Sequence, residues 1–223
     1  DCLLSRGLGD VYKRQAIYEP RFLNCMYGFI PNRGCHDAIK ELYKRLNNTK
    51  ICYIVDADIK GFFDHMKHEW IIKFLNLDIK GPNIIGLVKK YLKVGVLDGG
   101  ELMMNEEGSA QGNIISPILA NIYMHNVLTL WYKFVITKEC KGDNFLIVYA
   151  DDFVAGFQYK WEAENYYKLL KERMEKFGLQ LEESKSRLLQ SGAYIARAKQ
   201  KSGESTSCLL YTSPSPRDKR QSR

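Results

Sequence analysis

The sequence has few of the features that mark secreted, membrane or zinc-ribbon proteins. Its six cysteines include no Cys-x-x-Cys pair, which argues against a disulfide framework and a zinc ribbon. No apolar run reaches the ~18 residues of a membrane span, and the N-terminus lacks the layout of a signal peptide. We therefore expect a soluble protein of a reducing compartment, cytoplasmic in a bacterium or inside an organelle, without a membrane partner.

What the sequence does contain is ordinary globular composition. Its 223 residues are 45% apolar and 26% charged, which is enough for one large domain or two small ones and argues against wholesale disorder. A chain of this length buries well over half of its unfolded surface, so its folding needs neither disulfides nor a metal.

The two ends of the chain look foreign to the rest. Residues 5–15 (SRGLGDVYKRQ) and 208–217 (CLLYTSPSPR) resemble translations of the opposite strands of one DNA element, a common tagmentation sequencing adapter. We therefore expect residues 1–15 and 208–223 to be adapter-derived and non-native. The alternative is a basic Ser- and Pro-rich tail that binds nucleic acid. Excluding both segments lowers the net charge from +7 to +3, which is compatible with nucleic acid but does not by itself indicate it.

Apolar periodicity within residues 16–207 predicts helices and short strands in alternation. The helical patterns cover 37–46, 68–75, 83–92, 116 to about 134, and 161–177. The strand patterns cover 51–59, a hairpin within 94–104, the hairpin strands 144–149 and 153–158, and a final pair at 179–181 and 186–189. Helices packed on an antiparallel sheet give an α+β class.

Three aspartates lie where the predicted strands end. Asp58 ends a hydrophobic strand, and Asp151 and Asp152 form the tip of a hairpin. Carboxylates brought together repel one another, and a hard cation such as Mg²⁺, which takes oxygen ligands, relieves the repulsion. Two such ions ~4 Å apart can activate a 3′-hydroxyl and stabilise a leaving pyrophosphate. Without further context, however, an Asp-Asp pair is more simply a polar hairpin tip.

Four other segments supply that context. With the YADD segment at 149–152, they occur in the order and spacing of the motifs of group II intron-encoded reverse transcriptases, also called maturases, and the resemblance covers nearly all of 16–207. The segments are YGFIPNRGCHDAI at 27–39, DIKGFFD at 58–64, SAQGNIISPILANIYMH at 109–125, YADD itself, and GLQLEESKSRLL at 178–189.

The resemblance implies a fold and an activity. The fold would be a polymerase palm over 51–207, an antiparallel sheet with helices on one face, with partial fingers over 16–50 and no thumb. The activity would be RNA-directed DNA polymerisation with two Mg²⁺ ions, an RNA template, a DNA primer and deoxynucleoside triphosphates. The full-length parent would also bind its group II intron RNA and help it splice. The fragment alone is expected to be inactive, since the thumb that grips the duplex is missing.

The resemblance also assigns metal-site residues. Asp58 and Asp151 would be the main metal ligands, with Asp152 close by and the backbone carbonyl of Ile59 completing one site. Lys185 would protonate the pyrophosphate, although a solvated surface lysine is an equal alternative.

Further positions would handle the nucleotide. Phe63 would exclude a ribose 2′-hydroxyl, although an ordinary core Phe is an equal alternative. Gln111 and Gly112 would line the nucleotide pocket, and Arg33 would contact phosphate through its guanidinium fork. Ile30 departs from the pattern, because the family usually has Arg there.

Two other functions share part of this pattern. One is a reverse transcriptase of another class, such as a retron, diversity-generating or CRISPR-associated enzyme. The other is a non-catalytic RNA-binding maturase relic. A polymerase of either class requires that Asp58 lie beside the turn at 151–152 in the folded chain.

Overall fold

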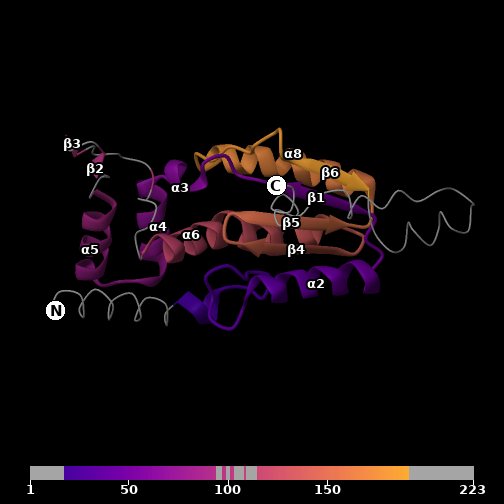
Figure 1. Cartoon of the computed structure of the whole chain (residues 1–223), viewed down its shortest axis with the longest axis horizontal. Helices are drawn as coiled ribbons and strands as arrows, with labels where there is room; N and C mark the ends of the chain where they lie inside the picture. The colour runs from indigo at the N-terminus through magenta and orange to yellow at the C-terminus, as the bar shows by residue number, and fades with distance from the viewer. Residues whose placement is uncertain (1–17, 94–96, 99–100, 103–107, 109–114, 191–223) are drawn as a thin grey trace, which may run out of the picture.

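An antiparallel sheet of four strands organises the molecule (Figure 1). The computed structural model describes residues 18–93, 97–98, 101–102, 108 and 115–190. The strand order is β4-β5-β1-β6, so β1 is central although it comes first in the chain. The strands are β1 (Tyr53–Ala57), β4 (Asn144–Tyr149), β5 (Asp152–Phe157) and β6 (Arg187–Gln190).

The sheet register separates a core face from an open face. β1 pairs with β5 from Tyr53 opposite Phe157 to Ala57 opposite Phe153. Side chains alternate between faces along a strand, so Val55 and Ala57 point into the main core and are at most 3% exposed. Asp56, between them, points to the opposite face.

Two long helical segments cover the core face. The first runs from α6 (Ser116–Met124) through two π-helical segments, His125–Thr129 and Tyr132–Ile136, to α7 (Thr137–Glu139). It therefore ends about five residues beyond the predicted end. The second is α8 (Lys160–Lys176), whose contacts are with β1 and β5. No helix in the described part of the chain is long and apolar enough to cross a membrane.

Helix α2 (Cys35–Asn48) packs on the opposite face of the sheet, and Figure 1 shows it beside β4. Its Ala38 and Leu46 pack with Ile54, Phe145 and Ile147 in a second, smaller core. The predicted palm is confirmed, with one addition: α2, which we assigned to the fingers, covers the β4 side of the face that we expected to be free of helices. The β1 side of that face carries the carboxylates.

The remaining elements are short. They are the 3₁₀ turn η1 (Glu19–Arg21), α3 (Phe62–His65), α4 (His68–Asp78), α5 (Pro82–Lys93), and the pair β2 (Leu97–Asp98) and β3 (Glu101–Leu102). The β2–β3 pair confirms the predicted hairpin. The predicted pairing of 179–181 with 186–189 is wrong, because β6 pairs with β1, and Leu181 makes a single bridge with Ile59. Both segments instead pair with the β1 chain: Arg187–Gln190 lies antiparallel to Tyr53–Asp56, and Leu181 lies opposite Ile59.

Candidate active site

The candidate active site is built where β1 ends and β5 begins. Ala57 is paired with Phe153, so Asp58 and Asp152 are the next residues on two hydrogen-bonded neighbouring strands. Asp151 precedes Asp152 in the tight turn that joins β4 to β5, where Tyr149 pairs with Asp152. The three predicted carboxylates therefore meet at one rim of the sheet, although more than ninety residues separate Asp58 from the other two.

The turn that carries two of these carboxylates is braced by the segment before α2. Ala150 in the turn has a φ of +58°, a left-handed conformation that is unfavourable for alanine. The Tyr27 amide donates to the Val148 carbonyl (2.9 Å). Gly28 lies so close to the Ala150 nitrogen that a methyl group on Gly28 would overlap it. The Gly28 carbonyl in turn accepts a bond from the Asn121 side chain at 2.7 Å.

The clustered carboxylates perturb one another. The pKa of Asp152 is raised, first by desolvation and then by the negative charges of Asp151, Asp58 and Asp56, against the opposing effect of Lys185. This pattern is typical of a region of negative potential that favours a cation.

Asp56 lies in the same region of negative charge and interacts with Asp58 and Asp152. Desolvation and the charge of Asp58 raise the pKa of Asp56, and Arg187, its cross-strand neighbour on β6, opposes the shift. We did not single out this residue from the sequence. Its position two residues before Asp58 on one strand was the available signal, because such residues share a face.

Lys185 is the cationic side chain that pairs with Asp58 in this structure. Its ammonium donates to Asp58 Oδ2 at 2.8 Å, and this bond raises the pKa of the lysine. A turn holds it there: the Glu182 amide donates to the Asp58 carbonyl (2.9 Å), and the Glu182 carbonyl accepts from the Lys185 and Ser186 amides. The side chain of Lys185 is nevertheless 68% exposed, so a substrate can still reach it.

The donor set fits a hard divalent cation in chemistry. The ligands are carboxylate oxygens, and the bridge with Leu181 turns the Ile59 carbonyl away from residue 181, toward the β5 side of the strand. In the part of the chain described, no three His, Cys, Asp or Glu side chains are arranged to hold a metal ion. The Lys185 ammonium bonds to Oδ2 of Asp58, so a metal ion that binds through this oxygen would compete with the ammonium.

Of the residues predicted to handle the nucleotide, the structure describes Phe63 but not Gln111 and Gly112. Phe63 is half-buried, and its ring lies edge-on to Phe62 with the centroids 5.4 Å apart. Gly108 lies against the backbone of Asp64 and the carbonyl oxygen of Phe63, and it donates its amide to the Met66 carbonyl at 2.9 Å. The chain therefore passes Phe63 just before Gln111 and Gly112, which themselves lie outside the described residues.

Arg33 is tied to its own loop. One terminal nitrogen of its guanidinium donates to the Leu23 and Met26 carbonyls (3.0 and 3.2 Å), and the other donates to Asn24 Oδ1 (3.2 Å). The structure therefore gives Arg33 a role that the sequence did not indicate, fixing the turn at 23–26. Its contact with phosphate stays a prediction.

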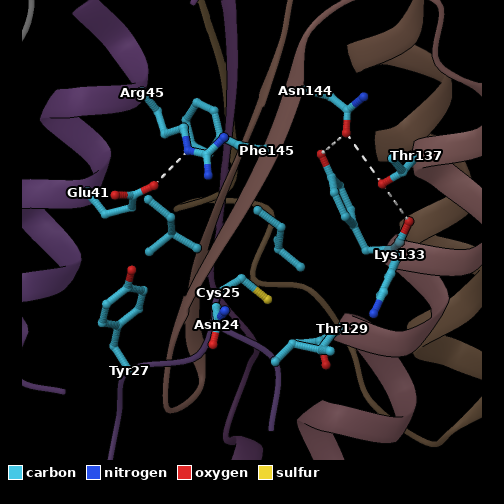
Figure 2. A pocket seen from close by; sticks show the side chains of 14 residues that line it. Asn24, Cys25, Tyr27, Glu41, Arg45, Thr129, Lys133, Thr137, Asn144 and Phe145 are labelled. Atoms are coloured by element: carbon cyan, nitrogen blue, oxygen red, sulfur yellow. Dashed lines mark hydrogen bonds and ion pairs between the residues drawn. The ribbon is translucent and has the colours of Figure 1, made fainter. Parts of the chain in front are cut away.

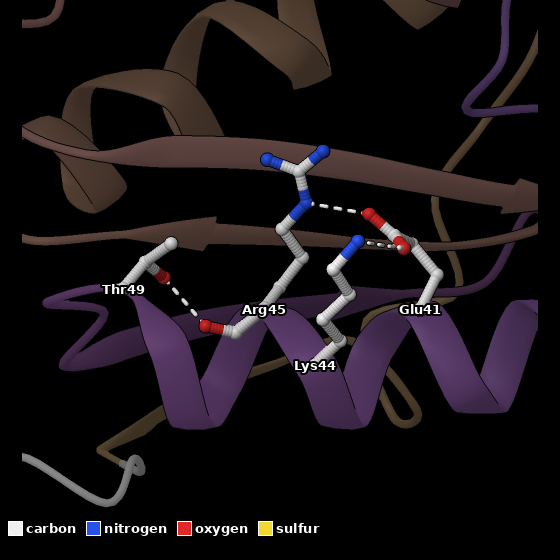
Figure 3. Close-up of polar contacts among 4 residues, drawn as sticks. All are labelled: Glu41, Lys44, Arg45 and Thr49. Atoms are coloured by element: carbon white, nitrogen blue, oxygen red, sulfur yellow. Dashed lines mark hydrogen bonds and ion pairs between the residues drawn. The ribbon is translucent and has the colours of Figure 1, made fainter.

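A separate cleft of about 590 Å³ lies along the outer edge of β4, between α2 and the π-helical segments (Figure 2). None of the predicted site residues lines it. Glu41 and Arg45 form its α2 wall and pair with each other at 2.7 Å. Lys44 adds a longer ion pair to Glu41, and Thr49 closes the helix by donating to the Arg45 carbonyl (Figure 3). This wall is stabilised by contacts within α2.

Replacing Asp152 by asparagine should stabilise the fold. Because the folded-state pKa of Asp152 is raised, the stability linked to its protonated form is present below about pH 4 and is lost as the pH rises through the folded-state pKa. At pH 7 the charge therefore costs stability. Water screens this exposed residue, so we expect Asp152→Asn to add less than about 1 kcal/mol.

Urea unfolding without divalent metal at pH 7 and pH 4 measures this effect. The gain should shrink at pH 4, and Glu172→Gln, at an exposed carboxylate on α8, should change stability at pH 7 by less than Asp152→Asn does. A loss of stability in Asp152→Asn at pH 7 would contradict the electrostatic account.

Comparison with known families identifies the chain. The family described as reverse transcriptase (RNA-dependent DNA polymerase) matches residues 5–207. The chain belongs to the reverse transcriptase family. Its predicted resemblance to group II intron-encoded members is confirmed by its curated relatives, of which the group II intron-encoded protein LtrA of Lactococcus lactis is 38% identical over 129 residues.

These relatives are much longer than the matched region. The LtrA match covers 58% of this reverse transcriptase chain and 20% of LtrA. A 91 kDa protein in the cob intron of Schizosaccharomyces pombe is 40% identical over 114 residues, which is 51% of this chain and 14% of that protein. The chain therefore spans a fifth or less of these two relatives.

Solved structures show the same fold. Apo telomerase from Candida tropicalis superimposes with a TM-score of 0.62 at 14% identity, over 84% of this chain and 36% of that one. A form truncated from its C-terminal domain gives a TM-score of 0.60 at 16% identity, over 85% of this chain and 41% of that one. At these identities the likeness supports the reverse transcriptase fold and nothing finer.

Proposed function

We propose that the chain is the palm, with part of the fingers, of a group II intron-encoded RNA-directed DNA polymerase. The observation that carries the proposal is the pairing that makes Asp58 and Asp152 neighbours across β1 and β5, next to Asp151. Membership of the reverse transcriptase family supports the reaction, and the likeness to LtrA supports the intron-encoded class over the retron, diversity-generating and CRISPR-associated classes. Its nucleic-acid partners would be an RNA template, a DNA primer and, in the whole protein, the intron RNA.

The reaction is nucleotidyl transfer. The 3′-oxygen of the primer forms a bond to the α-phosphorus of a deoxynucleoside triphosphate, and the bond from that phosphorus to the bridging oxygen breaks to release pyrophosphate. Two Mg²⁺ ions would supply Lewis acidity for the 3′-hydroxyl and charge stabilisation for the pyrophosphate. Asp58, Asp151, Asp152 and the Ile59 carbonyl would hold them.

The other residues act on the proton and the nucleotide. Lys185 would donate a proton to the leaving pyrophosphate; its hydrogen bond to Asp58 raises its pKa and keeps it protonated. Phe63 would close the pocket to a ribose 2′-hydroxyl. Gln111 and Gly112 would contact the incoming nucleotide, and Arg33 its phosphates.

Primer extension on an RNA template tests the proposal. The assay uses the complete protein, meaning the chain continued through the thumb that we predict downstream, with deoxynucleoside triphosphates and Mg²⁺. The wild type should extend the primer, whereas Asp151→Ala should not. Equal extension by both would overturn the assignment, and a wild type that binds RNA without extending would favour the maturase relic.

We also propose that residues 16–50 and 51–207 divide into fingers and palm and that the two ends are non-native. The translation of one adapter on opposite strands supports the second statement. Reading the genomic locus past residue 207 without adapter tests it.

A further inference from the structure

Phe29 combines two unfavourable features at one residue. Its φ is +53°, in the left-handed region that a bulky side chain rarely adopts. Among the described non-glycine residues, only Asn32 and Ala150 share this sign, and asparagine tolerates the conformation well. The Phe29 ring is also 57% exposed. A strained backbone that presents an apolar ring to solvent lowers the stability of the fold, and such strain concentrates at functional sites.

The neighbours of Phe29 hold it in this conformation. Gly28, on one side, is buried against Ala150. Ile30, on the other side, is 9% exposed, and its carbonyl accepts the Arg33 amide at 3.2 Å. The ring therefore projects from a fixed turn that abuts the turn carrying Asp151.

The charge of this region limits what the ring can bind. The carboxylates of Asp58, Asp151 and Asp152 repel phosphate unless metal ions intervene, and the residue after Phe29 is the apolar Ile30. An uncharged aromatic ring can instead bind the bases of a nucleic acid, because every base offers a π-face for stacking.

We propose that Phe29 is a stacking platform for a base of the primer–template at the active site. This inference rests on the proposed function and deepens it. The base belongs either to the template or to the primer end, and both offer the same planar ring. A protein segment that covers the ring is the competing explanation.

Phe29→Gly in the complete protein separates the two explanations. Glycine adopts a φ of +53° without strain, so its melting temperature should equal or exceed that of the wild type. Its affinity for an RNA–DNA primer–template, measured by fluorescence anisotropy, should fall about tenfold. Phe29→Trp should keep the affinity. Tyr43→Ala, which removes an aromatic ring on α2 that is 72% exposed, should change neither.

Photocrosslinking identifies the strand. One arm carries 5-iodouracil in the template and the other at the primer end, and we expect a crosslink to Phe29 from one of them. The inference is overturned if Phe29→Gly binds like the wild type, if its melting temperature falls by several degrees, or if neither arm labels Phe29. The proposed function fails separately, when the wild type does not extend a primer in the same preparation.

Discussion

Asp58→Asn is expected to reduce RNA-templated nucleotide incorporation by at least about 10³-fold, roughly 4 kcal/mol in the activation barrier, while the protein remains folded. The substitution removes the charge that β1 delivers to the rim shared with Asp151 and Asp152. An amide keeps the shape but is a poor ligand for a hard divalent cation. It also leaves Lys185 without the carboxylate that holds it at 2.8 Å.

Single-turnover incorporation of one nucleotide by the complete protein measures this loss without interference from product release. Thermal unfolding of the same variant shows whether the fold survives, and Glu172→Gln serves as the matched carboxylate control on the exposed face of α8. Asp58→Asn that incorporates nucleotide within tenfold of the wild type would remove Asp58 from the catalytic centre.

The sequence predicted the parts of this site that depend on strand order and local pattern. The apolar segment before YADD matches β4 residue for residue, and Asp58 lies beside Asp152 as the polymerase interpretation required. These features follow from short apolar runs and from carboxylates placed at strand ends, both of which are local.

The features that escaped prediction depend on contacts between distant segments. The packing of α2 against Phe145 and Ile147 depends on which face of the sheet is free, which periodicity does not indicate. Arg33 bonds to main-chain carbonyls of its own loop, and main-chain acceptors leave no mark in a sequence. The pairing of β6 with β1 also joins segments that are far apart in the chain, and local sequence patterns do not indicate such pairings.

Gly28→Ala is expected to have the second large effect, because Gly28 packs the segment before α2 against the turn that carries Asp151 and Asp152. The added methyl group would overlap the Ala150 nitrogen, which is backbone and cannot rotate away. Overpacking of this kind costs about 1–3 kcal/mol, and any relaxation has to displace the turn that carries Asp151. A shift of about 1 Å at reacting groups is enough to cost on the order of 10²-fold in rate.

Gly86→Ala provides the matched control for this prediction. Gly86 lies within α5, and a methyl group there meets nothing within 4 Å, so the same change should raise stability by up to about 1 kcal/mol. Urea unfolding and single-turnover incorporation by both variants separate two effects. If Gly28→Ala loses activity in proportion to its unfolded fraction, Gly28 only supports the fold. If the folded population also turns over about 10²-fold more slowly, the close approach of Gly28 to Ala150 sets the position of the carboxylates. Wild-type stability and rate in Gly28→Ala would show that the two turns are not in contact.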